Sequence, residues 1–532
     1  MKSKMGQRII SVFLCMVTVS VICFWRIYKI GQSETTAGST YNGYTLTLSS
    51  QRGTIFDCNL ASLTNSETKI LAAVSPTPRA ITAISGVLED EELETVLNTL
   101  REGKPAVVEV DSEIESDGII CVKVYENVSR DTVCEHLIGY LGADGHGVSG
   151  LQKAYDELLF SQDSVKVIYP SDAGGDFLLG AEPEVINNES VTNSGIALTI
   201  DRDIQRLTEQ AMGDVECGAA VVMEVGSGKI RAMVSRPDFD LSNIGDYLER
   251  ENSPLVNRAL SAYNVGSVFK PCVAAALIEN GGSEGYACNC TGSVVIAGHT
   301  FGCHNLSGHG NMNLSSAIEL SCNSFFYEFS QRLGADKIYN QAKIFSFGTA
   351  TDIGGISTDS GSIGSYTRLS SSETALANLS IGQGELLLSP ISILPLYEAI
   401  ANGGIYYTPT VIEGTVTGGV IERRGLSAPT RAMSQQTAEK LKEYLCRVVV
   451  SGTGTAAAPE NTTAAGKTAT AETGWRIDGE LIQNSWFCGF FPSENPKYAV
   501  SVLIENEKKN NITGAPIFKK IADSVTLLEK SQ

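Results

Sequence analysis

The sequence predicts an α/β or α+β sandwich, in which helices pack against a sheet. Two apolar runs, 219–225 and 230–234, surround a glycine-containing turn at 226–228 and predict a hairpin. Two more runs, 484–491 and 498–505, predict strands near the other end of the chain. Strands at both ends of a long domain, with helices between them, are typical of such a sandwich.

Local patterns predict several further elements. Alternation over 44–48 predicts a strand, and 90–100 predicts a helix. A helix over 199–212 would be capped by Asp201 and would bury one apolar face. The chain is expected to end in a helix over about 516–529.

Composition excludes some classes of protein. The 532 residues carry 60 acidic and 40 basic side chains, a net charge of −20, whereas a nucleic-acid binder needs a basic face. Thirteen cysteines are too few for a disulfide scaffold, and the odd number leaves at least one thiol without a partner in the chain. We therefore expect an ordinary apolar core to hold most of the fold.

The N-terminus carries a membrane signal. Residues 9–25 are mostly apolar and uncharged, and basic residues flank them on both sides. Seventeen residues are about the minimum for crossing a bilayer. A cleaved signal peptide is disfavoured because no small-x-small site follows, and a buried core helix because the run is apolar all round. We expect an uncleaved, single-pass anchor in the cell membrane, with the remaining chain outside the cytoplasm.

A turn-rich stretch at 187–195 predicts a linker between two domains. The expected division is a cytoplasmic tip and transmembrane anchor over 1–30, a mixed N-terminal domain over 31–193, and a main domain over 194–532.

Ser267 and Lys270 have Ser-x-x-Lys spacing. Residues three apart share a helix face, so the amine can reach the hydroxyl. A serine hydroxyl needs a base, and burial turns a lysine into one by lowering its pKa. The apolar run 272–278 predicts the helix that would bury it. The alternative is a helix-capping serine with a surface lysine; Ser66 and Lys69 have the same spacing.

Two further motifs lie downstream. Ser321 and Asn323 offer a hydroxyl and an amide that can relay a proton and hold a substrate amide, or simply cap a helix. The β-like run 466–470 contains a lysine and two threonines, which can bind a carboxylate, while its backbone N–H groups can bind an oxyanion. The alternative there is an edge strand with a solvent-facing lysine.

The order Ser-x-x-Lys, Ser-x-Asn, Lys-Thr-x is more specific than its parts. With it, the chain resembles the class B penicillin-binding proteins, membrane-anchored peptidoglycan D,D-transpeptidases. This resemblance implies an antiparallel sheet flanked by helices, an all-helical subdomain and a pedestal over 31–193. Nothing resembles the glycosyltransferase module of class A enzymes. Other matching stretches are 265–271, 308–310, 321–326, 381–384 and 486–489, with the pedestal motifs 52–57 and 147–156.

The resemblance assigns roles by matching motif. Ser267 would be acylated by a stem peptide ending in D-Ala-D-Ala, with Lys270 as base and Ser321 as proton donor to the leaving D-alanine. A second stem peptide would take the acyl group, making the cross-link, whereas a β-lactam would remain trapped. No cofactor or metal is implied, and the implied membrane partner is a SEDS-type glycosyltransferase. Substrate would be held by Asn323, Lys467 and Thr468, and its oxyanion by the backbone N–H groups of Ser267 and Thr470.

Ala469 departs from the family pattern, which has glycine there. Because glycine permits the closest backbone approach, we expect the methyl group to crowd the ligand and weaken or alter β-lactam acylation without abolishing it.

Five side chains that bind metals or oxidise lie within 22 residues: Cys288, Cys290, Cys303, His304 and His309. Free thiols, a Cys290–Cys303 disulfide and a zinc site all remain open, since the spacing fits no standard zinc finger. Cys322 is expected to be a small packing residue.

Two other functions share these motifs. A non-catalytic β-lactam sensor or scaffold of the cell-wall machinery would keep the fold, but the complete set of the first two motifs argues against lost activity. A β-lactamase would need a water-activating carboxylate, and a pedestal and anchor fit it poorly. The sequence leaves open a role in elongation, septation or sporulation.

Overall fold

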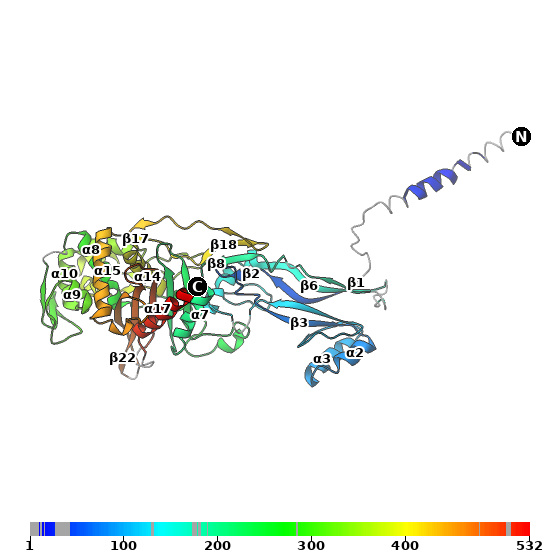
Figure 1. Cartoon of the computed structure of the whole chain (residues 1–532), viewed down its shortest axis with the longest axis horizontal. Helices are drawn as coiled ribbons and strands as arrows, with labels where there is room; N and C mark the ends of the chain where they lie inside the picture. The colour runs from blue at the N-terminus through cyan, green and yellow to red at the C-terminus, as the bar shows by residue number, and fades with distance from the viewer. Residues whose placement is uncertain are drawn as a thin grey trace.

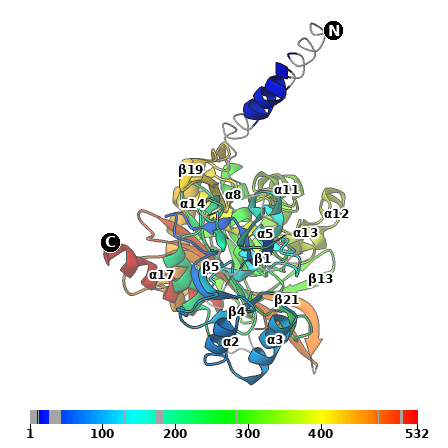
Figure 2. The same cartoon turned by 90° about the vertical axis from the view of Figure 1, so that its right-hand side faces the viewer.

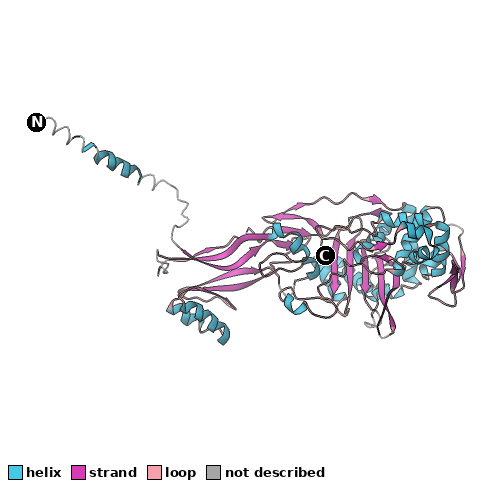
Figure 3. Ribbon diagram, turned by 180° about the vertical axis from the view of Figure 1, so that it is seen from behind, coloured by secondary structure: helices cyan, strands magenta, loops and turns pink. Residues whose placement is uncertain are grey.

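The computed structural model describes residues 10, 13–14, 16–26, 43–128, 132–172, 178, 182–188, 190–282, 286–477, 479–506 and 512–531. The body of the molecule is elongated, with a cluster of helices at one end and long strands at the other (Figure 1). A sheet lies between them, as the view from behind shows (Figure 3), and it has five strands.

This central sheet confirms the predicted sandwich. Its strand order is β10-β9-β23-β22-β21, and all neighbours are antiparallel. The predicted hairpin forms two strands of the sheet, and strands from the end of the chain pair beside it. The strands are β9 (Gly218–Glu224), β10 (Ile230–Arg236), β21 (Ala465–Ile477), β22 (Glu480–Phe491) and β23 (Tyr498–Ile504).

Both faces of the sheet are covered, which explains why its strands are continuous apolar runs. Successive residues of β9 belong to two different cores: Ala220 and Val222 pack with α7 and α17, whereas Ala219 and Val221 pack with α14 on the other face. The helices are α7 (Arg202–Ala211), α8 (Lys270–Glu279), α9 (Leu314–Glu319), α10 (Asn323–Leu333), α11 (Ala335–Ile344), α12 (Tyr366–Ser371), α13 (Glu373–Ser380), α14 (Pro390–Ala401), α15 (Gln435–Val450) and α17 (Gly514–Ser531).

The predicted helix at 199–212 starts later than expected. Thr199 is buried, and its hydroxyl donates to the carbonyl oxygens of Ile230 and Thr410. This residue therefore belongs to the segment that joins β8 to the helix, and not to the helix itself. Asp201 is the predicted cap, because its Oδ1 accepts from the N–H groups of Asp203 and Ile204. The final helix is confirmed, two residues longer at each end than predicted.

The N-terminal part contains the predicted strand at 44–48, within β1, and the predicted helix at 90–100, as α3. Figure 2 shows α2 and α3 at this end of the molecule, where α3 packs against β4 and α2 against β3. The elements are β1 (Gly43–Arg52), β2 (Thr54–Phe56), β3 (Glu67–Val74), α2 (Pro78–Ile84), α3 (Asp90–Arg101), β4 (Ala106–Val110), β5 (Ile119–Glu126), α4 (Glu135–Ile138), α5 (Gly150–Ala154), α6 (Asp156–Leu159), β6 (Phe160–Pro170) and β7 (Glu184–Ile186).

A mixed sheet connects this part to the rest. Its order is β19-β18-β8-β2, and β2 pairs parallel with β8. The two upstream motifs meet beside it: the Arg52 guanidinium donates to Gln152 Oε1 at 2.7 Å and to Asp156 Oδ1 at 2.8 Å. The connecting strands are β8 (Gly195–Leu198), β18 (Ile412–Thr417) and β19 (Val420–Arg423).

Short ribbons complete the described fold. They are β11 (Cys288–Cys290) with β14 (Gly310–Met312), β12 (Ser293–Ile296) with β13 (His299–Gly302), β15 (Ser362–Ile363) with β16 (Leu386–Leu387), and β17 (Ile405–Tyr406) with β20 (Thr430–Arg431).

At the N-terminus, residues 10, 13–14 and 16–26 are helical. The membrane span predicted over 9–25 lies partly outside the described residues. Among those that are described, no helix has the length and apolar character needed to cross a bilayer.

Candidate active site

Ser267 lies in a one-turn 3-10 helix, η2 (Gly266–Phe269), that leads directly into α8. Its neighbours are fixed on both sides: the Gly266 N–H donates to the Gly382 carbonyl oxygen at 2.9 Å, and the buried Tyr397 hydroxyl donates to the Val268 carbonyl oxygen at 2.8 Å. The capping serine considered above is wrong, because Val265 occupies the cap position of η2. Ser267 is half-buried, with its hydroxyl facing the second motif.

Lys270 is completely buried at the start of α8, which is apolar around its whole circumference. Its Nζ donates to the Ser321 carbonyl oxygen at 2.8 Å, to Ser321 Oγ at 3.3 Å and to Asn323 Oδ1 at 2.7 Å. Burial lowers the pKa of Lys270 to about 7, so a large fraction of the amine is neutral near neutral pH. A neutral amine can accept a proton.

Ser321 connects the lysine to the first serine. Its hydroxyl donates to Ser267 Oγ at 3.2 Å. The hydrogen bonds described for the Lys270 amine go to Ser321 and Asn323, and none of them goes to Ser267. Ser321 has a φ of +55°, in the left-handed region that a non-glycine residue rarely adopts. The helix-terminal cap considered for this motif is present in the backbone: Ser321 closes α9, with its N–H donating to the Ile318 carbonyl oxygen and the Cys322 N–H donating to that of Ala317. The Ser321 hydroxyl is not used in a cap, because it donates to Ser267 Oγ.

The third motif lies on β21, the strand at one edge of the central sheet. The expectation of an edge strand is confirmed, but the solvent-facing lysine is wrong: Lys467 is completely buried. Burial, and then the nearby Lys270, hold the pKa of Lys467 well below its usual value. Thr468 is half-buried with its Oγ1 3.0 Å from Thr453 Oγ1, and Thr470 is exposed.

The Ala469 methyl group points into the protein. Its side chain is 6% exposed and belongs to the same apolar core as Val268 and Phe269. Strand alternation places it on the face of Lys467, opposite Thr468 and Thr470. The expectation that this methyl group crowds the ligand is therefore not supported by its position.

The structure thus brings together the hydroxyls of Ser267 and Ser321, the Lys270 amine and the Asn323 amide. No carboxylate takes part in the hydrogen bonds described among these four groups. The same holds for the described hydrogen bond of the Lys467 amine, which goes to the Thr468 carbonyl oxygen. Sequence reasoning missed a residue beside them. Cys322, expected only to fill space, lies with Cys290, Cys303 and His309, whereas Cys288 and His304 lie outside this group.

A serine that reaches a buried, partly neutral lysine through a second serine is the arrangement of a serine acyl-transferase. Residues 218–523, more than half of the chain, match the family described as penicillin binding protein transpeptidase domain. The chain belongs to this family.

Several curated proteins are similar in sequence over most of this chain. Stage V sporulation protein D of Bacillus subtilis is 27% identical over 98% of this chain and 84% of its own length. PbpB of Mycobacterium tuberculosis is 29% identical over 74% of this chain and 60% of its own length. Peptidoglycan D,D-transpeptidase MrdA of Haemophilus influenzae is 27% identical over 75% of this chain and 65% of its own.

Solved structures share the fold. Penicillin binding protein 3 of Mycobacterium tuberculosis, complexed with aztreonam, has a TM-score of 0.66 at 24% identity, covering 91% of this chain and 97% of that one. The Helicobacter pylori complex between PBP2 and MreC has a TM-score of 0.66 at 20% identity, covering 92% of this chain and 99% of the matched one.

Proposed function

We propose that this chain is a class B peptidoglycan D,D-transpeptidase that forms an acyl-enzyme on Ser267 and that β-lactams acylate the same residue. The observation that carries the proposal is the hydrogen-bonded path from Lys270 Nζ through Ser321 Oγ to Ser267 Oγ. This path gives the nucleophile a base, and burial of the amine gives that base a suitable pKa.

In the first half-reaction, Ser267 Oγ attacks the carbonyl carbon between the two terminal D-alanines of a stem peptide. Its proton passes to Ser321 Oγ, whose own proton passes to the neutral Lys270 amine. The tetrahedral oxyanion is held by the backbone N–H groups of Ser267 and Thr470. As the C–N bond breaks, Ser321 gives a proton to the departing D-alanine nitrogen and regains one from Lys270.

In the second half-reaction, the amine of another stem peptide attacks the ester carbon. The amine loses its proton along the same path, and Ser267 Oγ leaves and is reprotonated, which completes the cross-link. Asn323 Oδ1 accepts from Lys270, so the NH2 group of Asn323 is the part that can donate to a peptide carbonyl. Lys467 and Thr468 bind the terminal carboxylate of the donor peptide.

The organisation of the chain is part of the proposal. Residues 1–30 anchor it in the cell membrane by a single span, 31–193 form a pedestal, and 194–532 form the transpeptidase domain outside the cytoplasm. The hydrogen bonds that Arg52 makes to Gln152 and Asp156 support a rigid pedestal. Its proposed membrane partner is a SEDS-type glycosyltransferase. The Helicobacter pylori PBP2, which shares the fold, forms a complex with MreC.

The test is labelling of the full-length chain in detergent with a fluorescent penicillin. We expect a stable adduct that Ser267→Ala abolishes. Ser66→Ala is the matched control, because Ser66 begins the other Ser-x-x-Lys stretch and is exposed on the N-terminal part. An unlabelled but folded chain would favour the scaffold function, and rapid turnover of the adduct by water would favour a β-lactamase.

A further inference from the structure

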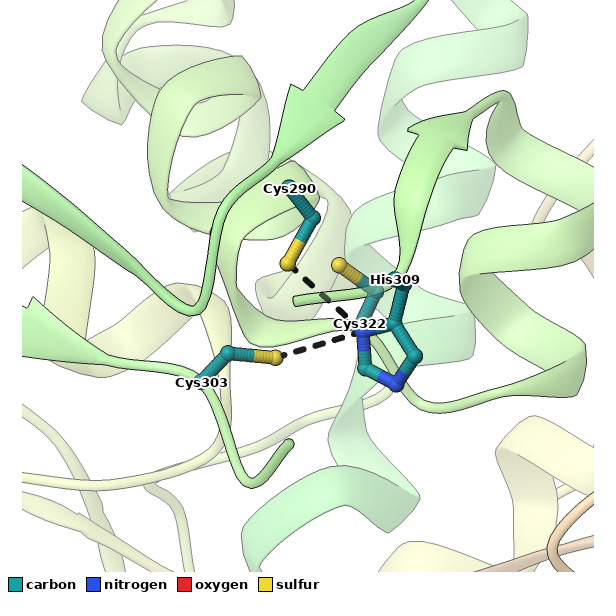
Figure 4. Close-up of side chains that lie close together, drawn as sticks. All are labelled: Cys290, Cys303, His309 and Cys322. Carbon is teal, nitrogen blue, oxygen red and sulfur yellow. Dashed lines mark hydrogen bonds between the residues drawn. The ribbon is translucent and has the colours of Figure 1, made fainter. Parts of the chain in front are cut away.

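Four side chains from different segments converge beside the second motif. Cys290 ends β11, Cys303 follows β13, His309 precedes β14, and Cys322 caps α10. Their sulfur and ring nitrogen atoms all lie within 4.8 Å of one another. Figure 4 shows the three thiols and the imidazole pointing toward a common centre.

The distances fit tetrahedral metal coordination. Zinc binds thiolate sulfur at about 2.3 Å and imidazole nitrogen at about 2.0–2.1 Å, so two such ligands of one tetrahedral ion lie roughly 3.6 Å apart. His309 Nδ1 lies 3.6 Å from Cys290 Sγ and 3.5 Å from Cys303 Sγ. His309 Nδ1 is therefore as far from these two sulfur atoms as two ligands of one tetrahedral zinc ion are from each other.

The chemistry of the four ligands also selects zinc. Three cysteines and one histidine form a ligand set of structural zinc sites, and all four positions are filled by protein. The three cysteine side chains are at most 3% exposed, and all three are free thiols. A Cys290–Cys303 disulfide would use two of these sulfurs and would leave the convergence of His309 and Cys322 on the same point unexplained.

We propose that Cys290, Cys303, His309 and Cys322 bind one Zn²⁺ ion in a closed structural site. The segment from β11 to β14 consists of ribbons three or four residues long, which bury few apolar side chains of their own. Metal bonds to both ribbons and to the N-cap residue of α10 stabilise this segment, which has little hydrophobic core of its own.

The zinc ion also positions the second motif. Cys322 lies between Ser321 and Asn323, so a metal bond to its sulfur fixes the backbone that carries both side chains. Ser321 holds its left-handed conformation there, with its hydroxyl 3.2 Å from Ser267 Oγ. This consequence, unlike the metal site itself, rests on the proposed function.

Metal content tests the site. The full-length chain, purified under reducing conditions and analysed by elemental and native mass spectrometry, is expected to hold one zinc ion. Cys303→Ser, Cys322→Ser and His309→Asn each lose it. The matched controls, Cys288→Ser and His304→Asn, retain it. His304 Nδ1 lies 3.9 Å from Cys303 Sγ, but neither His304 nor Cys288 is among the four side chains whose ligand atoms converge.

A spectroscopic measurement on the unaltered chain tests the site without relying on variants that could misfold. Exchange of zinc for Co²⁺ is expected to give the visible bands of tetrahedral cobalt and a thiolate charge-transfer band. The proposal is overturned if the chain takes up neither ion, if thiol counting finds Cys290 and Cys303 joined in the native chain, or if the controls lose metal as the ligand variants do.

Acylation tests the positioning role. Removal of zinc by a chelator is expected to slow penicillin labelling of Ser267 by about 10- to 100-fold, the effect of displacing a reacting group by a fraction of an ångström to one ångström, and added zinc restores it. Equal labelling with and without zinc would overturn the positioning role alone. A zinc-loaded chain that is never labelled would overturn the proposed function and leave the metal site standing.

Discussion

The methyl group of Ala469 packs against Gly266, the residue before the proposed nucleophile. A Cβ atom at position 266 would lie 3.3 Å from the Cβ of Ala469 and 3.3 Å from that of Ala471. Gly266 has a φ of +60°, which also favours glycine. The alanine of the third motif therefore occupies space that the absent side chain of Gly266 leaves open, on the inner face of β21.

This packing predicts that Ala469→Gly leaves penicillin acylation within about threefold of the original rate. The variant should lose about 1 kcal/mol of unfolding free energy, because glycine in a strand costs backbone entropy and gives up the buried methyl contact. Acylation kinetics and urea denaturation measure the two effects. A tenfold faster acylation would instead mean that the methyl group does obstruct the ligand. Gly266→Ala is the companion variant and should be slower and less stable.

The pKa of Lys270 predicts a pH dependence. Since burial lowers this pKa to about 7, the neutral amine is lost as the pH falls through that value. The rate constant for penicillin acylation should therefore fall about tenfold per pH unit well below 7 and level off above it. Lys270→Arg is the control, because a guanidinium stays protonated and its residual rate should lack this rise. A flat profile for the original chain would rule out Lys270 as the base.

Local patterns predicted much of this molecule. The hairpin at β9 and β10, the Asp201 cap and the final helix depend on neighbours within a few residues, and the three motifs were recognisable by their spacing. The convergence of Cys322 with Cys290, Cys303 and His309 could not be recognised from the sequence, because it depends on how separate loops fold together. The same holds for the inward direction of Ala469 and for the bridging position of Ser321.

The bridging hydroxyl predicts a large effect of Ser321→Ala. Without it, Lys270 has no hydrogen-bonded path to Ser267 Oγ, and acylation should slow by about 10²- to 10⁴-fold. Ser321→Gly removes the same hydroxyl but suits the left-handed backbone, so it should match the alanine variant in rate and exceed it in stability by about 1 kcal/mol. The time course of penicillin labelling measures the rate, and thermal unfolding measures the stability. Full activity in either variant would mean that Lys270 reaches Ser267 directly.

Arg52 should determine the stability of the N-terminal part. Its guanidinium is 6% exposed and donates to Gln152 Oε1, to the Gln152 carbonyl oxygen and to Asp156 Oδ1 at 2.7–2.9 Å. Arg52→Met would remove the cation from the Asp156 carboxylate, which keeps its bonds to the Gly147 N–H and to His146, and would take a donor from two Gln152 oxygens in a largely buried setting. We therefore expect a loss of about 3 kcal/mol in urea denaturation. Arg79→Met is the matched control, because the Arg79–Asp117 ion pair is more than three-quarters exposed and should contribute less than about 0.5 kcal/mol.

Arg52 ends β1 beside the mixed sheet that connects the N-terminal part to the rest, and its described hydrogen bonds go to Gly145, Gln152 and Asp156 rather than to the catalytic motifs. Its loss should therefore leave the rate of Ser267 acylation unchanged wherever the variant is folded. Slower acylation without a loss of stability would show that the pedestal acts on the catalytic site, and not merely as its support.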